Sequence, residues 1–281
     1  LVMASDPDAD RVGAAVKNNE GEWVLLNGNQ TALMFVYYLI TRWKELGKIN
    51  GKEYIVKTIV TTETIKTIAE RNGVEMYDVY TGFKWIANVM RENEGKKNYI
   101  GGGEESYGFL CEDFVRDKDA VSACVILAEI AAWAKDQGLS LYQLLQKIYV
   151  EYGFSKEKGI SVVKKGKSGA EEIEAMMKKF RENPLTEIAG SKVTYFYDYS
   201  TLKGKDYAEN ETVTLDMPTT SNVLQYFTED NTKVSIRPSG TEPKIKFYCE
   251  VHSKVKNIDE LPEAEKAAEE KINQIKASLG I

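Results

Sequence analysis

The chain has 281 residues, 43% of them hydrophobic and 10% aromatic, so it can bury a substantial core and is not a disordered segment. Its formal net charge of −6 argues against a broad basic surface for nucleic acid, but it does not exclude local basic sites for small anions. The most apolar stretches, residues 32–40 and 120–134, are too short or too interrupted to span a bilayer, so we expect no membrane segment.

The cysteines indicate the redox compartment of the protein, and the first residues indicate whether the chain is part of a longer one. Cys111, Cys124 and Cys249 have neither paired nor metal-type spacing, and reduced thiols in a cytoplasm fit them best. We expect no signal peptide. The first residue is Leu1, and residues 1–6 read as a strand that leads straight into an acidic loop. We therefore expect a fragment of a longer protein.

The first half of the chain alternates strands with helices. Strands are predicted on both sides of a turn at residues 18–21, and then at residues 53–60, 74–81 and 98–105. Helices are predicted at residues 29–46, 61–73, 82–95 and 118–138, the second with a threonine cap at its start and Gly73 at its end. This alternation predicts a mixed α/β domain with a largely parallel sheet.

The pattern changes near residues 150–157. Strands are predicted at residues 159–166, 192–200, 211–217, 221–228, 233–240 and 244–251, and helices at residues 169–182 and 261–280. Several strands with only two helices predict an α+β domain with antiparallel strands at the C-terminal end.

The first candidate site is an acidic loop. Asp6, Asp8 and Asp10 alternate along it and Arg11 follows at once. Alternate residues of an extended backbone lie roughly 6 to 7 Å apart, so the loop must curl before the carboxylates can share an ion. Hard oxygen ligands suit Mg²⁺ or Ca²⁺, but an EF-hand would need glycine where Arg11 stands and glutamate where Lys17 stands. The alternative is a solvated acidic turn.

The second candidate site follows three glycines at residues 101–103. These glycines bring Glu104, Glu105 and Ser106 to the end of a predicted strand. Carboxylate and hydroxyl groups together can bind sugar hydroxyls. A flexible turn with solvated glutamates is the alternative, and the spacing is not that of a dinucleotide-binding loop.

The third candidate site is an Arg-x-Ser-Gly-Thr sequence at residues 237–241. A guanidinium, two hydroxyls and a glycine amide are the components of a phosphate-binding nest. In the strand that follows, alternation puts Lys246 on the face opposite Phe247, where it can add charge to the same site. The alternative is an ordinary turn between strands.

Four further side chains are less specific. Lys84 lies at a predicted helix start, where a positive charge is unfavourable unless an anion is near, and Arg116 and Lys118 precede the long helix. Each by itself is typical of a surface cation. His252, the only histidine, has no nucleophile motif beside it and is expected to be structural.

The order of these motifs resembles the α-D-phosphohexomutase family of phosphoglucomutases and phosphomannomutases. The resemblance covers essentially the whole chain and rests on Asp-x-Asp-x-Asp-Arg at residues 6–11, Thr-Gly-x-Lys at 81–84, Gly-Glu-Glu-Ser-Tyr-Gly at 103–108 with Lys-Asp at 118–119, and Arg-x-Ser-Gly-Thr at 237–241. In that family four domains surround one cleft and each contributes a loop.

The resemblance implies roles for the first-half motifs. Asp6, Asp8 and Asp10 become ligands of Mg²⁺, with Arg11 beside them in the active site. Among the other matches, Glu104 and Ser106 bind sugar hydroxyls, Lys84 is the cleft lysine, and Lys118 is the lysine proposed as general acid/base. A base needs a pKa near neutrality, and we expect cationic surroundings to lower that of Lys118.

The resemblance likewise assigns the second-half motif and the substrate. Arg237, Ser239, Gly240 and Thr241 match the loop that holds the non-reacting phosphate, with Lys246 as a further cation. The Glu-Glu-Ser-Tyr-Gly wording is closer to glucose-type members than to the GEMSGH loop of phosphomannomutases or the GEQSGH loop of glucosamine enzymes. It favours interconversion of glucose 1-phosphate and glucose 6-phosphate, an isomerase reaction with a phosphorylated sugar as partner.

One departure concerns the phosphoryl carrier. The family uses a serine in a loop resembling Thr-Ala-Ser-His-Asn-Pro, and no such sequence occurs in this chain. The family layout then assigns residues 1–25 to the end of domain 2, residues 26–152 to domain 3 and residues 153–281 to domain 4. The piece alone is expected to be inactive without the N-terminal domains. A phosphomannomutase, a phosphopentomutase, a sugar-bisphosphate synthase and a non-catalytic phosphosugar-binding module remain alternatives.

Overall fold

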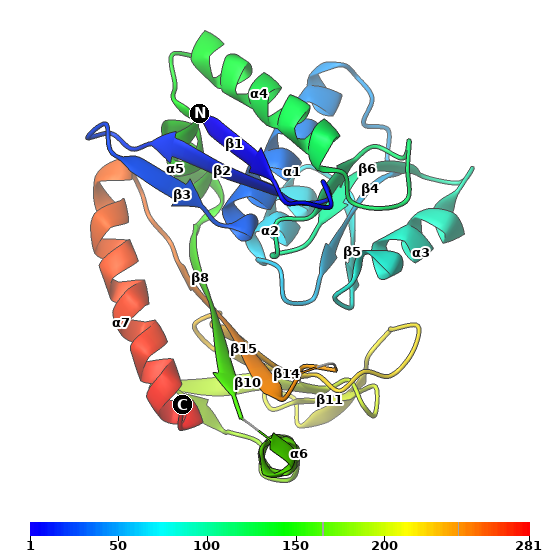
Figure 1. Ribbon diagram of the computed structural model, residues 1–281, viewed down its shortest axis with the longest axis vertical. Helices are drawn as coiled ribbons and strands as arrows, with labels where there is room; N and C mark the ends of the chain where they lie inside the picture. The colour runs from blue at the N-terminus through cyan, green and yellow to red at the C-terminus, as the bar shows by residue number, and fades with distance from the viewer. Residues whose placement is uncertain (165, 241) are drawn as a thin grey trace. The chain divides into compact units, whose positions relative to one another are not determined.

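The computed structural model describes residues 1–164, 166–240 and 242–281. The chain forms two compact units, one of Leu1–Phe154 with Val255–Ile258 and one of Ser155–Lys254 with Asp259–Ile281 (Figure 1). Over the described ranges, no helix is both long and apolar enough to cross a membrane. Each unit is considered by itself below.

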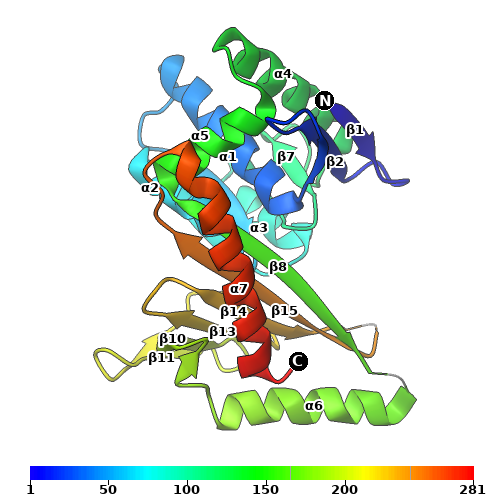
Figure 2. The same cartoon turned by 90° about the vertical axis from the view of Figure 1, so that its left-hand side faces the viewer.

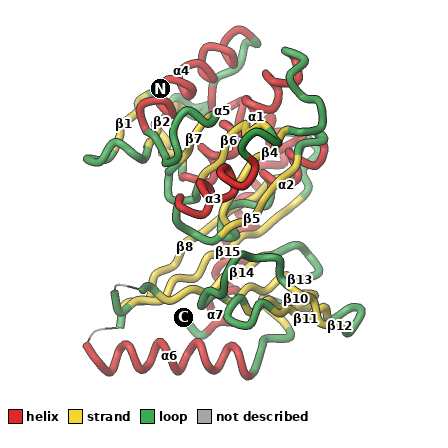
Figure 3. The backbone as a smooth tube through the Cα atoms, turned by 90° about the vertical axis from the view of Figure 1, so that its right-hand side faces the viewer, coloured by secondary structure: helices red, strands yellow, loops and turns green. Residues whose placement is uncertain are grey.

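The first unit is built around a four-stranded sheet. Its strands are β4 (Glu53–Thr58), β5 (Glu75–Val79), β6 (Asn98–Gly103) and β7 (Phe109–Cys111), in the order β5-β4-β6-β7 (Figure 3). β4 pairs in parallel with β5 and with β6, and only β7 is antiparallel. Every residue of β4 is buried, as expected of a central strand covered on both faces. The prediction of a largely parallel sheet is confirmed.

Helices cover both faces of this sheet. They are α1 (Gly28–Glu45), α2 (Thr64–Arg71), α3 (Phe83–Asn93), α4 (Ala120–Asp136) and α5 (Leu141–Tyr152). α3 packs on the face that carries Tyr54, Val56 and Tyr99. On the other face, Phe35 of α1 stacks on Phe109 with 4.6 Å between ring centroids. The sheet therefore has an apolar core on each side.

Some local predictions for this half were wrong. α2 has Glu63 at its N-cap with no side-chain cap bond, not the expected threonine cap. α5 was not predicted, although Ser140 and Gln143 form a capping box that marks its start in the sequence. β7 was missed because three residues are too few to show alternation.

A second, small sheet lies at the start of the first unit. β1 (Val2–Ser5), β2 (Val12–Lys17) and β3 (Trp23–Leu26) form an antiparallel meander, and α4 packs against β1 and β2. The acidic loop is the connection from β1 to β2. Its two ends are joined by a hydrogen bond from the Asp6 N–H to the Arg11 carbonyl, 3.3 Å long.

The second unit has one large sheet with two long helices. The sheet runs in the order β12 (Glu211–Thr214), β11 (Lys203–Asp206), β10 (Ser191–Asp198), β13 (Leu224–Thr228), β14 (Lys233–Pro238), β15 (Lys244–Ser253) and β8 (Phe154–Val163), with β9 (Glu187–Ile188) paired to β10. The helices are α6 (Gly166–Glu182) and α7 (Leu261–Leu279), with a short 3-10 turn, η1 (Ile258–Glu260), before α7. The predicted α+β architecture with antiparallel strands and two helices is confirmed, while β9 and β11 were not predicted.

The core of the second unit lies between the helices and one face of its sheet. The ring of Phe180 in α6 meets that of Phe247 in β15, and the Tyr226 hydroxyl donates to the Phe180 carbonyl. α7 runs beside β15 (Figure 2). Because neighbouring residues of a strand point to opposite faces, Lys246 leaves the sheet on the face away from Phe247.

Candidate functional site

The acidic loop is curled by its own hydrogen bonds. Asp6 Oδ1 accepts the backbone N–H groups of Asp10 and Arg11, each at 3.1 Å. Burial by itself would raise the pKa of Asp6, but these hydrogen bonds bring it below the usual value. Ala9 takes a left-handed backbone with φ 56°, which lets the chain turn back toward β2. The loop is curled, but it brings no three carboxylates, histidines or cysteines of the described residues together as a metal cluster.

The donors of the loop nevertheless fit a hard cation. Asp10 Oδ1 is buried and accepts no hydrogen bond from the described residues, and Arg11 Nε lies 3.8 Å from it. Asp8 is exposed and its carboxylate is open to solvent. Carboxylate oxygens are the ligands that Mg²⁺ prefers, so Asp6, Asp8 and Asp10 stay candidates to hold it.

Lys118 reaches the same loop from the segment before α4. Its Nζ lies 2.8 Å from Asp10 Oδ2 and 3.4 Å from Asp117 Oδ1. Burial by itself lowers the pKa of Lys118, but the two carboxylates more than offset burial and raise the pKa above its usual value. The expected lowering by cationic neighbours is therefore wrong for this structure, because the nearest charges are negative.

The stem of Lys118 lies over a glycine of the Glu-Glu-Ser-Tyr-Gly loop. A Cβ placed on Gly108 would come within 2.6 Å of Lys118 Cδ and 3.5 Å of Glu104 Oε2. The side chains of Lys118 and Glu104 thus flank Gly108, and the missing Cβ leaves room for the lysine.

Glu104 joins this loop to the Thr-Gly-x-Lys motif. Its carboxylate is buried, and Oε1 accepts the backbone N–H of Gly82 at 2.7 Å, directly before α3. The second residue of α3 is Lys84, which is exposed and holds its Nζ 5.1 Å from the centroid of the Trp85 ring. One carboxylate oxygen of Glu104 is thus used structurally, and the other faces the Gly108 side.

The backbone of the loop is fixed by two neighbouring elements. The Val12 N–H donates to the Tyr107 carbonyl at 3.2 Å, and Arg11 forms an antiparallel bridge with Gly108. At the start of α1, a Cβ on Gly28 would lie 2.0 Å from the Glu105 carbonyl oxygen. Asp10, Arg11, Glu104, Ser106 and Lys118 are therefore held within one small region of the first unit, while Lys84 sits at its margin.

A buried lysine supports this region and was not predicted from the sequence. Lys57 is 1% exposed at the end of β4, and its Nζ lies 2.9 Å from Glu63 Oε1 and 2.6 Å from Asp78 Oδ1. The next residue, Thr58, donates to Glu105 Oε2 at 3.3 Å. A single lysine in a strand carries no sequence signal for burial, so only the fold could identify it.

The second unit holds the remaining predicted residues. Arg237 and Lys246 are direct partners across β14 and β15, so their side chains share one face of the sheet. In the turn that follows β14, the Ser239 N–H donates to the Lys244 carbonyl at 2.8 Å and the Ser239 hydroxyl accepts from the Glu242 N–H at 3.3 Å. Thr241 lies outside the described residues.

The charges of this turn are unevenly paired. Lys244 forms an ion pair with Glu242, and that pairing lowers the pKa of Glu242 below its usual value. Arg237 and Lys246 make no ion pair or side-chain hydrogen bond with any described residue. Like charges directly opposite on antiparallel strands repel, so this pair favours an anion between them. Gly240 is exposed, and a Cβ added to it would meet no described atom within 4 Å.

His252 interacts with charged side chains of the same sheet. Its Nε2 lies 2.8 Å from Glu250 Oε1, and Glu250 Oε2 lies 2.9 Å from Lys233 Nζ. Glu250 and Lys233 are 3% and 1% exposed. This arrangement is that of a buried ionic network.

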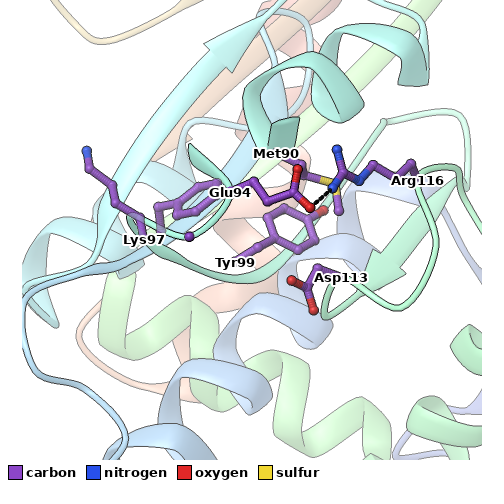
Figure 4. A pocket seen from close by; sticks show the side chains of 8 residues that line it. Met90, Glu94, Lys97, Tyr99, Asp113 and Arg116 are labelled. Carbon is purple, nitrogen blue, oxygen red and sulfur yellow. Dashed lines mark ion pairs between the residues drawn. The ribbon is translucent and has the colours of Figure 1, made fainter. Parts of the chain in front are cut away.

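The first unit has a small pocket beside Tyr99, at the start of β6. Glu104 follows the other end of that strand, so the pocket is separate from the candidate site. Figure 4 shows the Glu94 carboxylate facing the Arg116 guanidinium beside the Tyr99 ring, with 2.8 Å between Glu94 Oε1 and Arg116 Nη2. The volume of the pocket is about 30 Å³, which is room for about one water molecule. Arg116 therefore forms an ion pair with Glu94. The pocket is too small for a sugar.

Comparison with known families decides the class of the chain. Residues 27–152 match the model of phosphoglucomutase/phosphomannomutase alpha/beta/alpha domain III, and residues 162–268 match the model of the C-terminal domain of the same family. The chain belongs to the phosphoglucomutase/phosphomannomutase family. The predicted family is thus confirmed.

Curated relatives show how much of such a protein the chain represents. The phosphoglucomutase of Staphylococcus aureus (strain USA300) is 38% identical over 261 residues, which are 93% of this chain and 46% of that protein. The phosphoglucomutase of Staphylococcus haemolyticus (strain JCSC1435) is 33% identical over 252 residues, which are 90% of this chain and 45% of that protein. The chain therefore spans less than half the length of these relatives.

Solved structures agree on the fold. The open form of pp63/parafusin, a phosphoglucomutase from Paramecium, has a TM-score of 0.60 at 18% identity and covers 99% of this chain with 46% of its own. A putative phosphomannomutase from Thermus thermophilus has a TM-score of 0.58 at 20% identity and covers 95% of this chain with 45% of its own. At these identities the likeness concerns the fold only.

Proposed function

We propose that this chain binds a phosphorylated hexose as part of a phosphoglucomutase-type isomerase. The observation that carries the proposal is the pair Arg237 and Lys246, which face one another across β14 and β15. Neither forms an ion pair within the described part of the chain, although the Lys246 charge helps to lower the pKa of Glu242, whose carboxylate pairs with Lys244. A phosphate dianion between them would remove their repulsion and accept charge-assisted hydrogen bonds. Ser239, Gly240 and Thr241 would add hydroxyl and amide donors to the same phosphate.

Recognition of the sugar is assigned to the Glu104 and Ser106 loop. Glu104 Oε1 is bound by Gly82, which fixes the carboxylate, while Oε2 faces the Lys118 side. The Ser106 hydroxyl is half-buried and has no hydrogen-bond partner in the described ranges. A fixed acceptor and a free hydroxyl suit ring hydroxyl groups.

Catalytic roles are proposed for the residues around the acidic loop. Mg²⁺, held by Asp6, Asp8 and Asp10, would neutralise charge on a transferring phosphoryl group when bound. Arg11 would bind phosphoryl oxygens, and Lys84 would add positive charge beside the region. Lys118 would exchange a proton with a sugar hydroxyl, which requires that its pairing with Asp10 be weakened at that stage, because the pairing keeps it protonated.

The whole reaction is proposed to interconvert glucose 1-phosphate and glucose 6-phosphate through a phosphoserine and a bisphosphate. The serine would come from a segment that corresponds to the other half of the curated relatives, so the 281 residues alone should be inactive. Residues 1–25 would then close domain 2, residues 26–152 form domain 3 and residues 153–281 form domain 4. Three cysteines that form no disulfide fit the cytoplasm.

Activity of the longest form of the protein that carries this chain tests the proposal. That form should interconvert the two glucose phosphates with Mg²⁺, and kcat/KM for mannose, glucosamine and pentose phosphates should be lower. Higher values for one of those sugars would reassign the substrate, and no turnover with any of them would contradict the proposal. Turnover by the 281 residues alone would contradict the role of the missing serine.

A further inference from the structure

Tyr107 has a backbone conformation that its side chain does not favour. Its φ is +74°, in the left-handed region where the Cβ of an L-residue lies close to the backbone. Such a conformation persists only where the surroundings impose it. Here they do, since the Tyr107 carbonyl accepts the Val12 N–H at 3.2 Å and a Cβ on Gly28 would lie 2.7 Å from the Tyr107 nitrogen. Glycine would satisfy the same backbone without strain.

The tyrosine side chain makes few specific contacts within the described part of the chain. Tyr107 is 40% exposed, and no hydrogen bond, ion pair or ring contact involves its side chain over the described ranges. A large aromatic residue that is 40% exposed at a strained position, with no polar or ring contact to the described residues, adds little specific stabilisation to the fold. It is one residue from Ser106 and three from Glu104, in the loop to which sugar recognition is assigned.

We propose that Tyr107 is a specificity-determining residue whose ring packs against the bound hexose phosphate. This inference rests on the proposed function. A pyranose has an apolar face of C–H groups, and an aromatic ring covers such a face with few rotatable bonds to fix. The ring would thereby contribute affinity that depends on the orientation of the sugar.

Three variants of the 281-residue chain separate this role from a structural one. Tyr107→Gly removes both the strain and the ring, Tyr107→Asn keeps a residue that tolerates left-handed backbone but lacks the ring, and Tyr107→Phe keeps the ring. The matched control is Glu112→Gly, which relieves the strain of another exposed residue, φ 59°, at the far end of β7. Thermal unfolding and calorimetric titration with glucose 1-phosphate are measured for each.

Loss of the Tyr107 ring together with its backbone strain should raise the thermal stability and weaken sugar phosphate binding. Tyr107→Gly should raise the unfolding midpoint by about 2–4 °C and weaken glucose 1-phosphate binding about tenfold. Tyr107→Asn should weaken binding equally, Tyr107→Phe should stay within about twofold, and Glu112→Gly should gain stability with unchanged binding. Unchanged binding in both Tyr107→Gly and Tyr107→Asn would overturn the role of the ring while leaving the proposed function intact. No binding by the unsubstituted chain would overturn the proposed function and the role of Tyr107 with it.

Discussion

The Nζ of Lys118 lies 2.8 Å from Oδ2 of Asp10, so the candidate proton-transfer residue is paired with a candidate metal ligand. The other oxygen of Asp10 is buried and accepts no hydrogen bond from the described residues. Asp10 thus faces Lys118 with Oδ2 and Arg11 with Oδ1, and a further cation bound at Asp10 would weaken its pairing with Lys118.

The first prediction concerns Mg²⁺ binding at this carboxylate. Asp10→Asn should weaken Mg²⁺ binding to the chain about tenfold or more, because an amide oxygen carries no net charge. Lys118→Met should strengthen it several-fold, since the competing cation is gone. Calorimetric titration with MgCl₂ measures both. Asp136→Asn, an exposed carboxylate at the end of α4, is the control and should bind as the unsubstituted chain does. Equal affinity in all four proteins would remove Asp10 from the metal site.

A second prediction concerns the contact between α1 and the Glu104–Gly108 loop. Gly28→Ala puts a Cβ 2.0 Å from the Glu105 carbonyl oxygen, and a backbone atom cannot move aside cheaply. We expect a loss of about 2–4 kcal/mol in the free energy of unfolding of the first unit, measured in urea. Gly13→Ala, whose Cβ would come no closer than 3.9 Å to Ala4 O, should change it by less than about 1 kcal/mol. Equal losses in the two variants would show that the close approach is not a constraint.

A third prediction separates ligand binding from stability at Gly240. A Cβ at this position meets no described atom and no left-handed φ is involved, so Gly240→Ala should leave the free energy of unfolding within about 0.5 kcal/mol. If a phosphate approaches the backbone here, the same methyl should weaken glucose 6-phosphate binding about tenfold. Unchanged affinity would mean that the glycine serves neither fold nor ligand.

A fourth prediction concerns pH. Burial by itself lowers the pKa of His252, but the Glu250 carboxylate raises it above the usual value. A raised folded pKa makes the protonated form part of the native state, so its stabilisation is complete below about pH 6.5 and is lost as pH rises through the folded pKa. The free energy of unfolding of the second unit should therefore fall over that window by up to about 1.4 kcal/mol per pH unit.

The chain makes this test simple because it has one histidine. NMR titration of that ring gives the pKa directly, and urea unfolding of the chain and of His252→Gln gives the stability. The variant should lose the slope over the same window. A histidine pKa below about 6.5, the ordinary value, or a slope that persists in His252→Gln, would assign the pH dependence to another group.

The sequence allowed prediction of the layered α/β half and the antiparallel half, because strand alternation is local. Motifs such as Arg237-x-Ser239 are local too, but the roles of their residues stay predictions. Long-range packing was not readable. Gly28 is constrained by its close approach to the Glu105 carbonyl, and Lys57 is paired with Asp78. Neither contact can be predicted from the residues next to Gly28 or Lys57 in the sequence. The sign of the Lys118 pKa shift failed in part for the same reason, since Asp10 lies far from it in sequence, although the adjacent Asp117 also raises that pKa.

The most direct test of the central claim is an NMR titration of the 281-residue chain with glucose 1-phosphate in the presence of Mg²⁺. We expect backbone amides of the Arg237–Gly240 turn to shift with a saturable dissociation constant, and Arg237→Ala to weaken that response. Unchanged amides in this turn, or an equal response in Arg237→Ala, would contradict the claim that Arg237 and Lys246 bind the phosphate.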